Sequence, residues 1–243
     1  CQDLAESLEQ FHATSAATAL ATRLAAKIKT ATPALSMLSV RGMMVHSAKW
    51  TPEMIRIGNI KDIIPLCGYG VPDEETALFS NEKYATFIFE NELIPYWEKD
   101  GSNTYNQLHF YDLPWPTEVL EQMGEENVKI RITLSYYVKP SPGYAGRSNK
   151  YRYPSATLHF DLKSASESME EFLCRRNKSE GEKRTDNDTN RWTIKQQRRE
   201  QGTVQSDWIE CTAAELASCG QIIIYPGQGW WKERKLANVD NVI

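Results

Sequence analysis

A serine near the start of the chain stands where reactive serines often stand, at the beginning of a small-residue helix. Ser15 lies in FHATSAATALATRLAAKIKT, where a polar stretch gives way to alanine and leucine. A helix N-terminus offers partial positive charge and free N–H groups to a developing oxyanion, and alanines let a substrate approach closely. The alternative is a capping role, in which the hydroxyl of Ser15 or Thr14 accepts a hydrogen bond from a free backbone N–H. The stretch alone leaves both roles open.

The helix that would carry Ser15 is indicated by apolar residues that recur every three or four positions. From Ser15 onward, the stripe consists of Ala17, Leu20, Ala21, Leu24, Ala25 and Ile28. Its width and small residues predict a helix that is buried on most sides and that ends before Pro33. A second apolar segment follows at 35–48, Thr51 can cap a helix that begins at Pro52, and CGYGVPD marks a glycine-rich turn.

The character of the sequence changes after about residue 80. Six short segments are β-branched, aromatic and often alternating: YATFIFENEL, NQLHFYDLPWP, NVKIRITLSYYV, SATLHFDLK, GTVQSDWIECT and GQIIIYPGQGWW. Together with the turn clusters between them, they predict an antiparallel β-sandwich. Trp230 and Trp231, neighbours in the last segment, are expected to face opposite sides of a strand, one of them in the core. The sequence thus predicts two domains, 1–80 and 81–243.

A long polar stretch separates the fourth and fifth of these segments. It carries nine Lys or Arg and five Asp or Glu over residues 175–200. Mixed charge favours a solvated loop over a nucleic-acid-binding patch, and we expect 177–200 to be the most mobile interior segment. DNDTN (186–190) has the spacing that opens a calcium loop, but Arg191 stands where glycine is needed and Gln197 where glutamate is needed. No calcium site is therefore predicted.

Composition excludes several classes of protein. With 243 residues, 41% hydrophobic and 25% charged, and a net charge of −4, the chain suits a soluble globular protein without nucleic-acid or membrane partners. No apolar run approaches the roughly 20 residues that a membrane helix needs. The five cysteines contain no C-x-x-C pair, and the four histidines are far apart. These features predict no metal site and no disulfide framework, and they favour free thiols in a reducing cytoplasm.

The segments around Ser15 resemble the subtilisin-like serine proteases (subtilases). ATSAATALATRLAA is similar to their serine motif, G-T-S-x-A followed by a small-residue helix. VRGMMVHSAKW resembles the next helix, and GYGVPDEETAL the glycine turn and short helix that close the core of the family. The segments from LPWPTEVL to IIIYPGQGWWKER resemble the β-rich C-terminal extension of one bacterial group of these peptidases. The order of these landmarks favours the nucleophile role of Ser15.

The resemblance implies a role for each matching residue. Ser15 would be the nucleophile of a serine endopeptidase, its backbone N–H one oxyanion donor, and Thr14 a support of the turn. Ala13 stands where the family usually has glycine, which is costly if that position needs a positive φ. The substrate would be a protein or peptide, and no cofactor is required.

The family presents its triad in the order Asp, His, Ser, and only 14 residues precede Ser15. His12 is too close along the chain to be assigned as the base, and His46 lies in a helix that resembles a non-catalytic segment. We therefore interpret the chain as the end of an α/β catalytic domain, inactive alone, followed by an all-β, jelly-roll-like sandwich in a bacterial cytoplasmic enzyme. The competing hypothesis is a β-sandwich that binds a peptide, sugar or partner domain beside a degenerate protease remnant.

Overall fold

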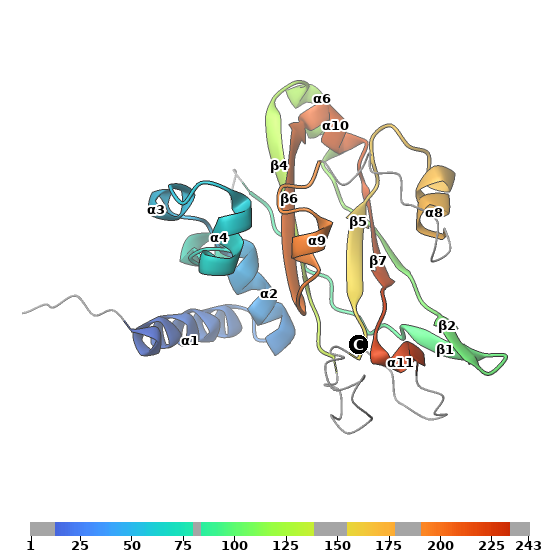
Figure 1. Cartoon of the computed structure of the whole chain (residues 1–243). Coiled ribbons are helices and arrows are strands. Elements are labelled where there is room, and N and C mark those ends of the chain that lie inside the picture. Colours follow the sequence, from blue (N-terminus) through green and yellow to red (C-terminus); the bar gives the residue numbers. More distant parts are fainter. Residues whose placement is uncertain (1–12, 80–83, 139–154, 178–190, 234–243) are drawn as a thin grey trace, which may run out of the picture. The chain divides into compact units, whose positions relative to one another are not determined.

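The structure, a computed structural model, describes residues 13–79, 84–138, 155–177 and 191–233 (Figure 1). The chain divides into two compact units, Cys1–Ile88 and Phe89–Ile243. Each unit is described by itself below. The candidate calcium stretch 186–190, and with it much of the predicted mobile loop, lies outside the described residues.

The described part of the first unit is helical. Its helices are α1 (Thr14–Ala31), α2 (Met37–Ser47), α3 (Pro52–Ile55), α4 (Ile60–Cys67) and α5 (Glu74–Leu78). The Ser36 hydroxyl caps α2 by accepting a hydrogen bond from Ser39 N at 3.2 Å. The Thr51 hydroxyl caps α3 by accepting one from Met54 N at 3.4 Å, with Pro52 as the first helical residue. The predicted cap at Thr51 is thereby confirmed.

Helix α1 packs on its neighbours through its C-terminal half. Leu24 and Ile28 form a small core with Val40 of α2 and Ala77 of α5. The N-terminal half is largely exposed, and the side chain of Leu20 is 64% exposed. The expectation of a helix buried on most sides is therefore wrong for the described structure. The apolar stripe is present, but only its C-terminal turns find a partner among the described residues of this unit.

An antiparallel β-bridge joins the residue pair Lys49 and Val71, which follow α2 and precede α5 respectively. Lys49 and Val71 exchange two backbone hydrogen bonds of 2.9 Å. Gly70 has φ +100°, and a Cβ at this position would lie 2.2 Å from the Lys49 carbonyl oxygen. The predicted turn therefore requires glycine at position 70 for two reasons, the positive φ and the close approach of the Lys49 backbone.

We expect Gly70→Ala to destabilise the protein more than Gly58→Ala, by at least about 2 kcal/mol, because only the first variant adds a backbone clash. Gly58 is the matched control, since it has φ +110° but no atom within 4 Å of an added Cβ. Its substitution brings only the conformational cost, about 1–3 kcal/mol. Urea denaturation followed by circular dichroism measures both variants. Equal losses of stability would contradict the close approach.

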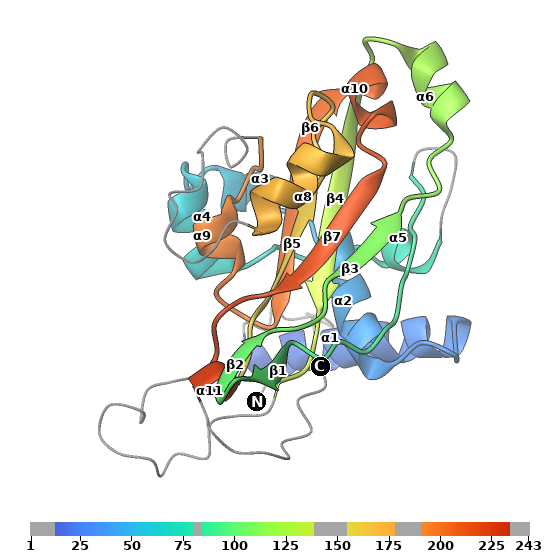
Figure 2. The same cartoon turned by 90° about the vertical axis from the view of Figure 1, so that its right-hand side faces the viewer.

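The strands of the second unit form small antiparallel sheets (Figure 2). In its described part, β1 (Tyr96–Lys99) and β2 (Ser102–Tyr105) make a hairpin. A three-stranded sheet has the order β3 (His109–Asp112), β7 (Gln221–Pro226), β5 (Leu158–Leu162). The third sheet pairs β4 (Asn127–Ser135) with β6 (Val204–Thr212). β3 to β7 confirm five of the six predicted strands.

The segment predicted as the first strand, 84–93, forms no strand. It runs extended, with the Phe89 ring 5.0 Å from the Tyr111 ring of β3. Leu93 is 3% exposed and packs with Tyr136, Val138 and Leu158. The segment has the composition of a strand. Pairing with β3, however, would turn the Leu93 side chain out of this cluster.

The prediction of an all-β domain is wrong in part, because helices interrupt the strands. They are α6 (Thr117–Met123), α8 (Met169–Asn177), α9 (Gln196–Arg199), α10 (Ala213–Ala217) and α11 (Trp230–Glu233). Trp230 and Trp231 lie in α11, so their expected places in a strand are also wrong, although Trp231 is a core residue at 3% exposure. The fold is a set of helices followed by small antiparallel sheets with further helices. The jelly-roll topology stays a prediction.

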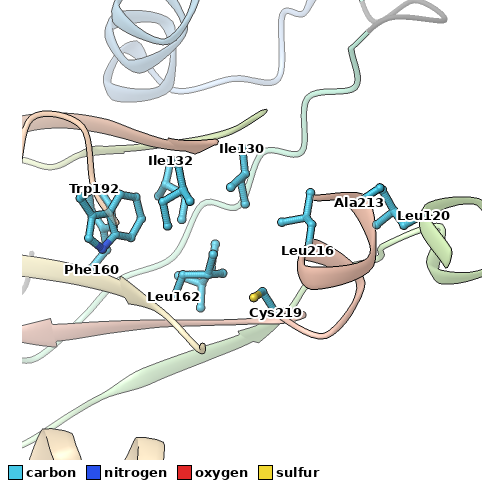
Figure 3. Packing of buried hydrophobic residues seen from close by; sticks show 11 residues of the cluster. Leu120, Ile130, Ile132, Phe160, Leu162, Trp192, Ala213, Leu216 and Cys219 are labelled. Carbon is cyan, nitrogen blue, oxygen red and sulfur yellow. The ribbon is translucent and has the colours of Figure 1, made fainter. Parts of the chain in front are cut away.

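One apolar cluster joins the two larger sheets of the second unit (Figure 3). Ile130 and Ile132 of β4 pack in it with Phe160 and Leu162 of β5, and Leu216 of α10 contributes from the end of β6. The alternating apolar residues from which β4 was predicted therefore point into a core that the two sheets share.

Part of the predicted solvated loop is packed instead. Trp192 and Arg199 are each 3% exposed. The Arg199 guanidinium lies 4.2 Å from the Phe160 ring centroid and 4.8 Å from that of Trp192. Fully buried Asp207 lies 3.7 Å from Arg199 and accepts a hydrogen bond from Ile194 N at 2.8 Å. The solvated-loop prediction is wrong for 191–199, where charge is paired inside the fold.

Two thiols pack against the shared core, Cys219 buried and Cys211 partly buried. Burial, with a smaller effect of the neighbouring Cys219, raises the pKa of the Cys211 thiol to about 11. At pH 8 about one Cys211 in a thousand is then thiolate, the reactive form. We expect iodoacetamide to modify exposed Cys174 in the folded protein while Cys211 and Cys219 react only after guanidinium is added. Peptide mass spectrometry checks this, and equal rates at Cys174 and Cys211 would contradict the burial.

Candidate functional site

Helix α1 begins at the residues that the sequence singled out. Ala13 is the N-cap, Thr14 the first helical residue and Ser15 the second. Neither hydroxyl caps the helix, since the N-cap position is held by Ala13 without a side-chain hydrogen bond. The capping alternative for Ser15 and Thr14 is therefore wrong. Ala13 has φ −152°, an extended conformation that alanine adopts without strain, so the absence of glycine here costs no backbone energy.

Backbone donors at the start of α1 are available to a ligand. Ala16 N and Ala17 N both donate to Ala13 O, at 3.1 and 3.3 Å. The N–H of Ser15 precedes these bonds and donates to no carbonyl among the described residues. Ser15 itself is exposed. A hydroxyl, an N–H with no acceptor among the described residues and the positive end of an 18-residue helix thus meet at one exposed point.

One contact at this site was not foreseen from the sequence. The Thr18 hydroxyl donates to Thr14 O at 2.8 Å, one turn further along α1. The signal was available, because a threonine four residues after a helical position regularly bonds back to that carbonyl.

Ion pairs anchor the C-terminal half of α1 and the helix beside it. Lys27 of α1 pairs with Glu74 of α5 and holds the pKa of this carboxyl below its ordinary value. Lys49 pairs with Asp73 at 2.8 Å and, together with the Thr76 hydroxyl, lowers the pKa of Asp73. Asp73 in turn caps α5. These exposed pairs add little stability individually, but they fix which side of α1 meets α5.

The described residues do not assemble a catalytic triad at Ser15. No hydrogen bond joins Ser15 to a histidine or carboxylate within them. His46 lies in the last turn of α2, which packs on the C-terminal half of α1 (Figure 1). His159 pairs with Glu200 at 2.9 Å inside the second unit. His12 lies outside the described residues.

Among the described residues, no group of three or more His, Cys, Asp or Glu side chains is placed to hold a metal ion. No described helix is long and apolar enough to cross a membrane.

The segment that contains this helix start is similar to one known protein family. Residues 2–86 match the model of the subtilase family, peptidase S8, a family of serine peptidases. The matched segment contains Ser15 and all of α1 to α5, so this part of the chain is similar to subtilases. The match supports a peptidase and does not extend into residues 87–243. No curated protein and no solved structure matches the chain.

Proposed function

We propose that Ser15 is the nucleophile of a serine endopeptidase of the subtilase family. The observation that carries the proposal is the position of Ser15, exposed in the first turn of α1 within the subtilase-matched segment. A structural serine at this place would be expected to cap the helix, and Ser15 does not.

The proposed chemistry is acyl transfer to the Ser15 hydroxyl. A general base removes the proton as Oγ attacks the peptide carbonyl, the amine leaves with a proton, and water releases the acyl-enzyme. The free N–H of Ser15 and the positive end of α1 would stabilise the oxyanion. Thr14 and Ala13 would hold the turn that presents Oγ.

The base, its carboxylate and a second oxyanion donor are assigned to sequence that precedes Ser15 in the full-length protein. This assignment follows the family order Asp, His, Ser. The substrate is proposed to be a protein or peptide, and the enzyme to work in the cytoplasm.

An active-site-directed phosphonate tests the proposal. The 243-residue chain and a version extended upstream through the presumed Asp and His are each prepared with Ser15 and with Ser15→Ala. We expect the phosphonate to label only the extended protein that retains Ser15, with the mass increase on the peptide that contains Ser15. Labelling of the Ser15→Ala protein would overturn the assignment of the nucleophile. Labelling of the short chain would show that its base lies within these residues.

A further inference from the structure

The three-stranded sheet has an open edge at β3 in the described structure. β3 pairs with β7 on one side, and the bond from Leu113 N to Gly220 O (2.7 Å) continues that ladder. Successive residues of a strand direct their backbone groups to opposite sides. Because Leu113 faces β7, the N–H and C=O groups of Leu108, Phe110 and Asp112 point away from it. None of these groups bonds to another described residue.

The β1–β2 hairpin continues toward β3 in a single register. Tyr96 lies opposite Tyr105, and the bonds from Asn106 N to Pro95 O (2.9 Å) and from Gln107 N to Ile94 O (3.2 Å) continue this register beyond the two strands. Extended by further pairs, the register places residues 93, 91 and 89 opposite 108, 110 and 112. Because two consecutive residues donate to the same segment here, the outward direction of the β3 groups follows from the β3–β7 ladder and not from the hairpin.

Residues 89–93 do not add to the sheet beside β3, because the Leu93 side chain is buried in another cluster. Leu93 is buried with Tyr136 and Leu158 on the inner side of the sheet. Phe110 lies opposite Ile223, which packs with Phe172 on the other side. Directly opposite residues share a face, so pairing in the hairpin register would turn Leu93 out of its cluster. The edge therefore stays open while Leu93 stays buried.

The side chains along this edge indicate what would bind there. Leu108 and Phe110 are 37% and 40% exposed. Asp112, the last residue of β3, is an exposed carboxylate, and Glu92 is an exposed carboxylate in the segment that precedes the hairpin. The strand HFYD contains none of the lysines or prolines that commonly protect an exposed edge. Apolar side chains along the strand and the negative charge of these carboxylates complement a peptide with β-branched residues between basic ones.

We propose that the open edge of β3 binds an extended peptide, apolar in its centre and basic at its ends, which adds to the sheet as its next strand. Backbone hydrogen bonds to Leu108, Phe110 and Asp112 hold the peptide, and Phe110 packs on its apolar side chains. The site belongs to the second unit, and its existence does not depend on the chemistry of Ser15.

The test measures binding of the fluorescein-labelled peptide Lys-Val-Thr-Val-Thr-Val-Lys to the whole chain carrying Ser15→Ala, so that no cleavage is possible. We expect fluorescence anisotropy to show saturable binding below about 1 mM. Phe110→Pro should weaken it at least about tenfold, because proline removes one outward N–H and blocks the edge. The bonds between β3 and β7 should survive, since Phe110 does not donate to β7.

Matched controls separate strand addition from other binding. Phe110→Val keeps the N–H and should bind within about threefold of the parent. A peptide N-methylated at alternate residues keeps its side chains and should not bind, and one with glutamate ends should bind more weakly. Undiminished binding to Phe110→Pro or by the N-methylated peptide would overturn the proposal, as would no saturation by the parent peptide. Self-association abolished by Phe110→Pro would assign the edge to a second copy of this chain instead.

Discussion

Replacing Ser15 by alanine is expected to lower kcat/KM of the full-length enzyme at least about ten-thousandfold, without loss of folding. The residue is exposed and makes no capping bond, so alanine, the best helix former, should preserve α1. The loss should fall on kcat, because a nucleophile acts in the reaction and contributes little to substrate binding. Peptide hydrolysis measures the rate, and urea denaturation checks that stability is unchanged.

Thr18→Val is the matched control for this prediction. It removes a hydroxyl from the same helix, one that bonds to Thr14 O rather than facing a substrate. Because this bond is exposed, its loss should change activity by less than about threefold. Losses of similar size in both variants would assign the effect of Ser15→Ala to helix structure, contrary to the nucleophile role.

The candidate site could be located from the sequence because its signals are local. Ser15, the small-residue run after it and the turn at Gly70 are all contained in short segments. The cap at Thr51 and the start at Pro52 follow from two adjacent residues. The exposure of Leu20 could not be foreseen, because periodicity identifies an apolar face without identifying what covers it.

The second unit shows where local patterns are insufficient. The hairpin β1–β2 carries a recognisable signal, Asp100-Gly101, and both residues have positive φ, 53° and 77°. By contrast, residues 84–93 have strand composition but form no strand, and Leu93 is buried by distant residues. The segment around Arg199 is polar in composition, yet its charge is paired with Asp207 on β6. Both outcomes depend on long-range contacts.

Asp207→Ala is expected to destabilise the protein by about 3–5 kcal/mol, because it breaks a buried ion pair from one side. The carboxylate is fully buried and accepts hydrogen bonds from Ile194 N at 2.8 Å and Lys195 N at 3.0 Å. Its removal leaves these two N–H donors without their acceptor and takes from the Arg199 guanidinium its fully buried carboxylate partner. Glu210→Ala is the control on the same strand, and its exposed pair with Lys129 at 3.8 Å should be worth less than about 1 kcal/mol.

The pH dependence of the same carboxyl group has a definite sign. Burial raises the pKa of Asp207, although the N–H donors and Arg199 offset part of this effect. The folded state therefore holds the proton more tightly than the unfolded chain. The resulting stabilisation is present below the ordinary pKa of an aspartate and is lost as pH rises through the raised value. Asp207→Asn cannot ionise, so the wild type should lose stability relative to it over this interval.

Combining Asp207→Ala with Arg199→Met distinguishes a broken pair from a simple loss of packing. Methionine has no charge to leave unpaired and can fill space beside Phe160 and Trp192. The double variant should therefore be more stable than the sum of the two single losses predicts, by about 1–3 kcal/mol. Urea denaturation of the four proteins gives this coupling energy. Strictly additive losses would show that Arg199 and Asp207 do not act as a pair, and that the interior of the second unit tolerates each charge alone.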